Sequence, residues 1–226
     1  MKGYFTTLEK VLWSVSTGVI LVTFLLFDRS SWLNLAASLV GVTSLIFCAK
    51  GHPVGQVLMI AFSLLYGIIS WQVRYYGEMI TYLGMTLPMA ALALVSWLRN
   101  PFEKGKAEVR VARITRRDWA VALTLTAAVT VVFYFILRAL GTANLIPSTV
   151  SVTTSFLAAY LTARRSPYYA LAYACNDAVL ILLWVLMARE DPASASVIAC
   201  FAAFLANDLY GFVSWRRMEK RQAIAA

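Results

Sequence analysis

Two Asn-Asp pairs are the polar groups of this sequence that are best placed to do chemistry. Asn176-Asp177 and Asn207-Asp208 each interrupt a long apolar run, whereas most other acidic residues lie between such runs. An aspartate in the middle of a membrane helix costs at least about 2.5–3.5 kcal/mol on insertion scales. Because such residues usually face a cavity or a polar partner, we interpret both pairs as candidate ligands of a bound molecule.

Helical spacing groups further side chains with these pairs, because residues three, four and seven apart lie on one face of a helix. By this rule Tyr173 and Trp184 share a face with the first pair, and Tyr210 lies beside the second. An alternative interpretation is that these polar groups hydrogen-bond between helices and only hold a bundle together. The predicted substrate-binding residues are Tyr66, Thr154, Tyr173, Asn176, Asp177, Trp184, Asn207, Asp208 and Tyr210.

Common catalytic and metal-binding patterns are absent from the sequence. It contains no G-x-x-x-x-G-K-[ST], no H-E-x-x-H and no G-x-S-x-G. The single histidine, His52, lies in a short loop, and Cys48, Cys175 and Cys200 are scattered through apolar runs without a C-x-x-C. Glu78, near the end of an apolar run, is interpreted as an interface acid in contact with water. We therefore predict no catalytic residue, no metal site, no cofactor and no enzyme activity; a membrane enzyme would need a larger acidic cluster.

The elements that must position these groups follow from composition. Of the 226 residues, 61% are hydrophobic and 14% charged, whereas a soluble domain is about 45–50% apolar and 25% charged. A helix needs about 20 apolar residues to cross a bilayer. We therefore predict an all-α membrane protein with eight transmembrane helices. The predicted spans are 11–27, 32–49, 54–73, 79–98, 119–140, 146–163, 168–187 and 194–215.

Lysine and arginine are distributed unequally between the two sides of this predicted bundle. With the N-terminus in the cytoplasm, the inner segments hold 16 of these residues and the outer loops hold 4. This asymmetry is a strong positive-inside signal, so we expect a multi-pass protein of the plasma membrane with both termini cytoplasmic. The net charge of +9 is explained by the cations of the cytoplasmic segments beside the lipid bilayer, so we predict no nucleic-acid partner.

Three local features lead to further expectations. The seven tryptophans lie near span ends and predict an aromatic belt at the lipid interface. Pro88 falls inside a span and predicts a helix kink. The connection Asn100–Asp118 is interpreted as a charged cytoplasmic linker, which could also bind anionic lipid headgroups.

The two halves of the chain resemble each other weakly. A Val-Ser-Trp segment ends the fourth span at Val95-Ser96-Trp97 and the eighth at Val213-Ser214-Trp215, an offset of 118 residues. This pattern predicts two parallel three-helix repeats, residues 32–99 and 146–218, in a single transport domain. A cytoplasmic linker and linker helix, 100–145, join them, and 1–31 supplies an extra N-terminal helix. Parallel repeats of this kind are a transporter architecture, with the substrate site near the membrane midplane.

Three motif-bearing segments resemble the PnuC-type vitamin transporters, which are related in architecture to the SWEET sugar transporters. They are residues 76–101, 166–177 and 207–215, and the resemblance extends over about 32–218. It implies a seven-helix core and facilitated diffusion, by alternating access, of an unphosphorylated vitamin that is most often nicotinamide riboside. A cytoplasmic kinase then traps the vitamin as a phosphate, and the family often forms homo-oligomers.

The resemblance also bears on the substrate. The family places a Trp and an Asn about one turn apart on the substrate helix, where this sequence has Tyr173 with Asn176 or Asp177. Tyrosines and carboxylates suit a cationic aromatic ring, which thiamine has as well as nicotinamide riboside. Alternative substrates are riboflavin and a deoxynucleoside. Proton coupling stays open as an alternative transport mechanism, and a non-transporting membrane subunit or sensor stays open as an alternative function.

Overall fold

The computed structural model describes residues 4–27, 29, 31–72, 76–142, 144–188 and 194–225, and these residues form helices joined by short connections and one longer segment. The helices are α1 (Thr7–Phe27), α2 (Trp32–Ala49), α3 (Val54–Gln72), α4 (Tyr76–Thr81), a π-helical segment (Tyr82–Thr86), α5 (Leu87–Arg99), α6 (Arg116–Ala139), α7 (Leu145–Ala163), α8 (Tyr168–Met187) and α9 (Ser194–Ala225).

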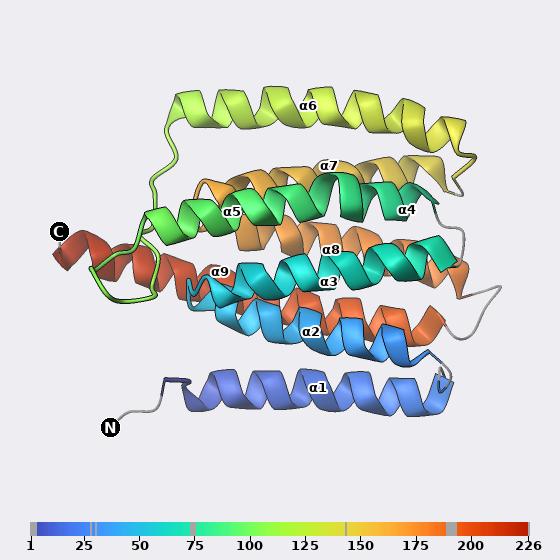
Figure 1. Ribbon diagram of the computed structural model, residues 1–226, viewed down its shortest axis with the longest axis horizontal. Helices are drawn as coiled ribbons and strands as arrows, with labels where there is room; N and C mark the ends of the chain where they lie inside the picture. Colours follow the sequence, from blue (N-terminus) through green and yellow to red (C-terminus); the bar gives the residue numbers. More distant parts are fainter. Residues whose placement is uncertain are drawn as a thin grey trace.

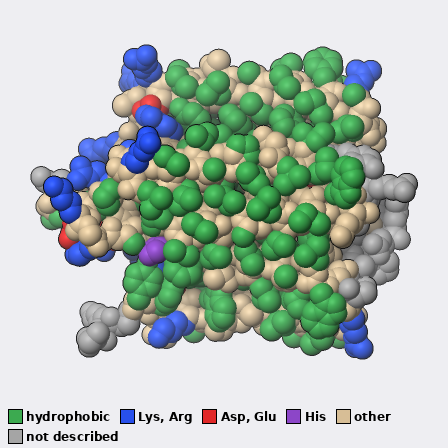
Figure 2. Space-filling view, viewed as in Figure 1, with side chains coloured by type: hydrophobic (Ala, Val, Ile, Leu, Met, Phe, Trp, Pro, Cys, Tyr) green, Lys and Arg blue, Asp and Glu red, His purple; other side chains and the backbone are tan. Residues whose placement is uncertain are grey.

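The eight predicted membrane spans are confirmed. Within the described part of the chain, eight helical stretches are long and apolar enough to cross a bilayer, with α4, the π-helical segment and α5 together making one of them. Hydrophobic side chains cover the middle of the molecule, and most charged side chains gather at its ends (Figure 2). This distribution of side chains is typical of a membrane protein, whose middle lies in the hydrocarbon core of the bilayer and whose two ends lie in water.

The helices lie side by side, with α1 and α6 as the two outermost layers (Figure 1). α1 packs on α2 and α9, and α6 packs on α7. Between them, the closest pairs are α8 with α9, α2 with α3 and α7 with α8, while α2–α9 and α5–α7 contacts join the first part of the chain to the last. The polar residues of α7, α8 and α9 therefore lie within one helix bundle.

Two helices begin earlier than expected because of capping boxes. At α1, the Thr6 N–H donates to Glu9 Oε2 (2.7 Å) and the Glu9 N–H donates to Thr6 Oγ1 (3.2 Å). At α6, Thr115 and Asp118 make the same reciprocal pair of hydrogen bonds. Each box satisfies two N–H groups that a helix start otherwise leaves unpaired. The predicted starts at residues 11 and 119 were therefore too late.

The expected kink at Pro88 takes the form of a π-helical segment, Tyr82–Thr86, directly before α5. Proline lacks an N–H, and its ring clashes with the carbonyl group four residues earlier, here that of Gly84. A wider turn relieves this clash without breaking the span. Such π-helical turns are frequent at functional sites, and this one carries Tyr82 into the bundle.

Part of the segment predicted as a charged linker is docked on the bundle. Residues 108–112, which we name the strap, lie against the part of α9 that continues from residue 215, the predicted end of the span, to Ala225. The Val109 N–H donates to Gly51 O (3.0 Å), and Gln222 Nε2 donates to Val109 O (3.0 Å). The Val109 side chain is completely buried. Residues 50–53, 100–115 and 164–167 and the last turns of α9 form one end of the bundle, which we name the basic end.

The prediction that all tryptophans form an interfacial belt was wrong for Trp97. Its ring is buried, and Nε1 donates to Thr162 O (2.9 Å) at the end of α7. The neighbouring Ser96 Oγ donates to Ala163 O (2.7 Å). The last carbonyl groups of a helix lack partners within the helix, so α5 closes the end of α7.

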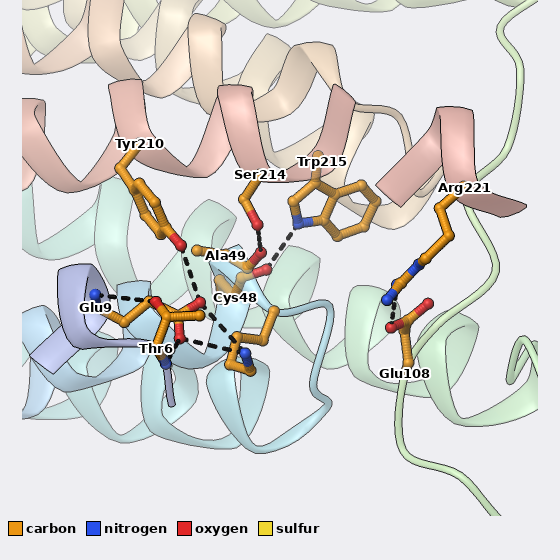
Figure 3. A network of polar contacts seen from close by, with 10 residues as sticks. Thr6, Glu9, Cys48, Ala49, Glu108, Tyr210, Ser214, Trp215 and Arg221 are labelled. Carbon is orange, nitrogen blue, oxygen red and sulfur yellow. Dashed lines mark hydrogen bonds and ion pairs between the residues drawn. The ribbon is translucent and has the colours of Figure 1, made fainter. Parts of the chain in front are cut away.

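The prediction of an interfacial tryptophan belt was also wrong for Trp215, whose ring is buried. Trp215 Nε1 donates to Cys48 O (2.8 Å) and Ser214 Oγ to Ala49 O (2.7 Å), so α9 closes the end of α2 (Figure 3). The Trp97 and Trp215 rings lie against each other, with centroids 5.3 Å apart. We name Ser96, Trp97, Ser214 and Trp215 the Ser–Trp clamp. Each half of the chain thus closes a helix of the other half, and the two parallel repeats stay a prediction.

Candidate functional site

A cavity of about 300 Å³ lies at the end of the bundle opposite the basic end. Its walls come from α4, the π-helical segment, the end of α6, the α6–α7 connection, α7 and α8. This volume is at the lower end of the range typical of small-molecule pockets. Its polar and aromatic lining includes Glu78, Tyr82, Ser148, Ser151, Ser155, Asn176 and Trp184.

Asn176 is the predicted site residue that the structure places deepest in this cavity wall. It is 6% exposed, and its Oδ1 accepts hydrogen bonds from Thr154 Oγ1 (2.9 Å) and Ser151 Oγ (3.2 Å). Because both hydroxyls hold the carbonyl oxygen, the amide group is fixed in one orientation and its NH₂ end points away from them. Thr154 is therefore a positioning residue for Asn176. A fixed amide in a cavity wall can recognise hydroxyl or amide groups of a ligand.

Two aromatic residues, Trp184 and Tyr82, line the same cavity. Tyr66, which was predicted as a ligand, lies behind Tyr82, with ring centroids 4.4 Å apart. It is outside the cavity lining, and it fixes the Tyr82 ring by packing. The serine hydroxyls and Asn176 belong to α7 and α8, whereas Tyr82 and Glu78 belong to the α4 side. The cavity thus has a hydrogen-bonding wall and an aromatic, acidic wall.

Glu78 is the functional candidate that the sequence interpretation missed. The expected interface acid is half-buried and lines the cavity, with its carboxyl group within hydrogen-bonding reach of the Tyr66 hydroxyl. The signal that could have identified it is its spacing of four residues before Tyr82, which places both on one helix face. Hydropathy alone did not separate a carboxylate facing water from one facing a cavity.

The Asp177 and Asp208 carboxyl groups lie against each other between α8 and α9, and both side chains are almost completely buried. Neither residue belongs to the cavity lining. Among the described residues, Asp177 Oδ2 has no hydrogen-bond partner. Tyr173 lies further toward the basic end, where it contacts Tyr169 and its hydroxyl reaches Thr162. These three predicted residues form an inner group between the cavity and the basic end.

Asn207 and Tyr210 face α1 and not the cavity. Asn207 Nδ2 donates to Ser16 Oγ (2.9 Å). The Tyr210 hydroxyl donates to Glu9 Oε1 (2.9 Å) (Figure 3). Glu9 is 3% exposed and also forms an ion pair with Lys50 Nζ (3.2 Å). These contacts attach α1 to α9 and to the end of α2, which is the bundle-holding role that polar groups often have between membrane helices.

The attachment of α1 can be tested with Lys50→Met. We expect this change to lower the free energy of unfolding in detergent by about 2 kcal/mol, because the buried Glu9 carboxylate loses its cationic partner. Lys10→Met is the matched control, since Lys10 is exposed on α1 and close in sequence to Glu9. Denaturation by sodium dodecyl sulfate measures both variants, and equal losses would contradict the proposed role of the ion pair.

The comparison with known proteins identifies the family. The family model for the nicotinamide mononucleotide transporter matches residues 31–217. A nicotinamide riboside transporter PnuC from Neisseria mucosa is 26% identical, covering 98% of this chain and 85% of the relative. A second PnuC, from Haemophilus influenzae, is 24% identical, covering 84% of this chain and 82% of the relative.

The fold has a solved counterpart. The crystal structure of the vitamin B3 transporter PnuC superimposes with a TM-score of 0.83 and 24% identity, covering 97% of this chain and 95% of that one. This likeness supports the helical arrangement, and the family model covers well over half of the sequence. The chain therefore belongs to the PnuC family of nicotinamide mononucleotide transporters and is a multi-pass membrane transporter, not an enzyme.

Proposed function

We propose that this protein carries nicotinamide riboside across the bacterial plasma membrane by facilitated diffusion. The observation that carries the proposal is a cavity in which a hydrogen-bonding wall, with Asn176 and serine hydroxyls, faces a wall with Glu78 and Tyr82. Nicotinamide riboside combines a hydroxyl-rich ribose with a cationic aromatic ring, so each part has a suitable wall. The two PnuC relatives are themselves named as nicotinamide riboside transporters.

The same cavity favours the unphosphorylated vitamin over the mononucleotide. Among the described residues that line it there is one acid, Glu78, and no lysine or arginine. Phosphate recognition normally uses arginine or lysine side chains, whereas Glu78 repels a phosphate. On this proposal, a kinase in the cytoplasm phosphorylates the vitamin after entry. The product no longer fits the carrier and stays inside.

Uptake of radiolabelled nicotinamide riboside into proteoliposomes that contain only this protein tests the proposal. Unlabelled nicotinamide riboside is expected to compete, and unlabelled mononucleotide, riboflavin and thymidine are expected not to. Protein-free liposomes are the control. Absence of saturable uptake would overturn the proposal, and stronger competition by thiamine would change the assigned vitamin and keep the carrier.

The orientation follows from charge. The basic end carries most of the Lys and Arg residues, so it faces the cytoplasm under the positive-inside rule, and both termini are cytoplasmic. The cavity then lies on the outer side. The halves 32–99 and 146–218 meet across the Ser–Trp clamp, which closes the cytoplasmic end. Alternating access consequently requires the clamp to open while the outer side of the cavity closes.

Opening of the clamp has an internal reporter, because Trp215 binds the carbonyl oxygen of the buried Cys48. In a variant whose other cysteines are replaced by alanine, Trp215→Phe is expected to speed labelling of Cys48 from the cytoplasmic side about fivefold. That factor corresponds to the loss of one hydrogen bond, about 1 kcal/mol. An impermeant thiol reagent added to inside-out vesicles measures the rate.

Trp119→Phe is the matched control for this experiment, because Trp119 is also at the cytoplasmic end but its ring lies against Tyr168 (5.9 Å) and not in the clamp. It is expected to leave the labelling rate unchanged. A Trp215→Phe variant that labels no faster than the control would remove the clamp from the transport cycle.

A proton-coupled carrier is the second candidate, and the Asp177–Asp208 pair is the observation that favours it. Two adjacent buried carboxyl groups can share and exchange a proton. Coupling predicts that a pH gradient alone drives accumulation in proteoliposomes and that a protonophore abolishes it. Facilitated diffusion predicts no effect of either treatment when the membrane potential is clamped at zero.

A further inference from the structure

We infer that Glu78 is a specificity-determining residue: its carboxylate makes the cavity select a cationic ring over an uncharged ring of the same shape. The inference rests on the proposed function, because it names what this cavity recognises in its substrate. It concerns the charge of the ligand and not its size or its hydroxyl groups.

The charge of Glu78 is unbalanced by the protein. None of the five ion pairs found among the described residues includes Glu78. No described residue of the cavity lining carries a positive charge. Its known partner is the neutral Tyr66 hydroxyl, which holds the carboxyl group in place without neutralising it. A carboxylate that is half removed from water and lacks a cation is stabilised when a cationic ligand binds beside it.

The aromatic wall acts in the same direction. Tyr82 is four residues from Glu78 and lines the same cavity, and Trp184 lines it from α8. The negative face of an aromatic ring attracts a cation by about 0.5–2 kcal/mol. The Tyr66 ring fixes Tyr82 in this wall. The carboxylate of Glu78 and the ring of Tyr82 therefore lie together on the α4 side, Trp184 adds a second ring from α8, and the ribose-binding groups lie on α7 and α8.

A simpler role for Glu78 is structural. Glu78 lies in the first turn of α4, where an acidic side chain stabilises a helix through its dipole. The two roles predict different results. A structural role changes stability and affects all substrates equally, whereas the proposed role changes the ratio between a charged and an uncharged substrate.

The experiment compares nicotinamide riboside with 1,4-dihydronicotinamide riboside, its reduced form, which has the same ribose and carboxamide but no positive charge. Initial uptake rates of both are measured in proteoliposomes clamped at zero membrane potential, so that the membrane does not favour either. Glu78→Gln keeps the shape of the side chain and removes its charge. We expect this variant to lower the ratio of cationic to neutral uptake by about tenfold.

Two further variants control the result. Glu103→Gln removes an exposed acid at the basic end and is expected to leave the ratio unchanged. Glu78→Asp keeps the charge and is expected to retain most of the preference for the cation. If Glu78→Gln does not assemble in liposomes, the stabilisation of Glu78→Asp and wild type by each ligand in detergent is compared instead, and equal stabilisation of wild type by both ligands contradicts the inference.

The outcomes separate this inference from the proposed function. Wild-type protein that takes up neither compound overturns the proposed function. Wild-type protein that transports nicotinamide riboside, with a cation-to-neutral ratio unchanged by Glu78→Gln, leaves the proposed function standing and overturns the role of Glu78.

Discussion

Replacing Asn176 with alanine is expected to lower the initial rate of nicotinamide riboside uptake at least about 100-fold. A site built to hydrogen-bond a substrate loses most of its discrimination when one buried partner is removed, because the remaining polar groups stay unpaired. Here the substitution removes the fixed amide from the cavity wall. It also deprives the Thr154 and Ser151 hydroxyls of a shared acceptor. Uptake per reconstituted molecule is the measurement.

Asn207→Ala is the matched control. Asn207 lies on the neighbouring helix α9 and, like Asn176, is directly followed by an aspartate. Its amide binds Ser16 of α1, so we expect lower thermal stability but near-normal uptake per folded molecule. Thr154→Val is expected to give an intermediate loss, because the amide remains but is held by Ser151 alone. Equal losses of uptake in the Asn176 and Asn207 variants would contradict the location of the site.

A membrane potential is expected to produce the second large effect. Nicotinamide riboside carries one positive charge, so a carrier that moves it alone also moves charge across the membrane. A potential of 100 mV is worth about 2.3 kcal/mol per charge, which corresponds to about fiftyfold accumulation at equilibrium. A potassium gradient with valinomycin sets the potential, negative inside, and the internal concentration of labelled vitamin measures the result.

The uncharged dihydro form is the control, because it should equilibrate without accumulation at any potential. If nicotinamide riboside also fails to accumulate, its charge is compensated by another ion during transport. Exchange of the vitamin for a proton through the Asp177–Asp208 pair would produce that result. The accumulation ratio of the vitamin at equilibrium thus decides between facilitated diffusion of the cation alone and its exchange for a proton, because the two predicted ratios differ by more than an order of magnitude.

The sequence predicts the eight spans well because the length and polarity of a membrane helix are set by the bilayer. Errors are confined to the ends of helices, where local contacts decide. The capping boxes at Thr6 and Thr115 lengthen α1 and α6 at their starts. At its other end, α9 continues ten residues beyond the predicted end at residue 215, and the strap packs against this extension. Hydropathy carries no information about such side-chain contacts.

The site is less predictable, because helical spacing identifies a face but not the neighbour of that face. Asn176 and Trp184 line the cavity, whereas Asn207 and Tyr210, chosen by the same reasoning, face α1. The difference depends on where α1 packs. For Glu78, a position near a span end is compatible with water, lipid headgroups or a cavity, and the packing of α4 on α3, beside the cavity, decides among them.

Tryptophan shows the same ambiguity. A Trp near the end of a span fits an interfacial belt, and it fits a buried donor to a helix end equally well. Trp97 and Trp215 take the second role, since each is preceded by a serine that donates to the next carbonyl group. The repeated Ser-Trp pair was visible in the sequence, but its meaning depends on the facing helix.

The strap is attached largely through its main chain. The course of this segment therefore depends little on which side chains it carries. The N–H groups of Val109 and Ala112 donate to Gly51 O and Arg165 O (both 3.0 Å). Hydrogen bonds of this kind are indifferent to side-chain identity. The exposed side chain of Arg110, the one basic residue of the strap, can therefore change during evolution to suit membranes of different lipid composition while the segment follows the same course. Only Val109, whose side chain is enclosed, is constrained by volume.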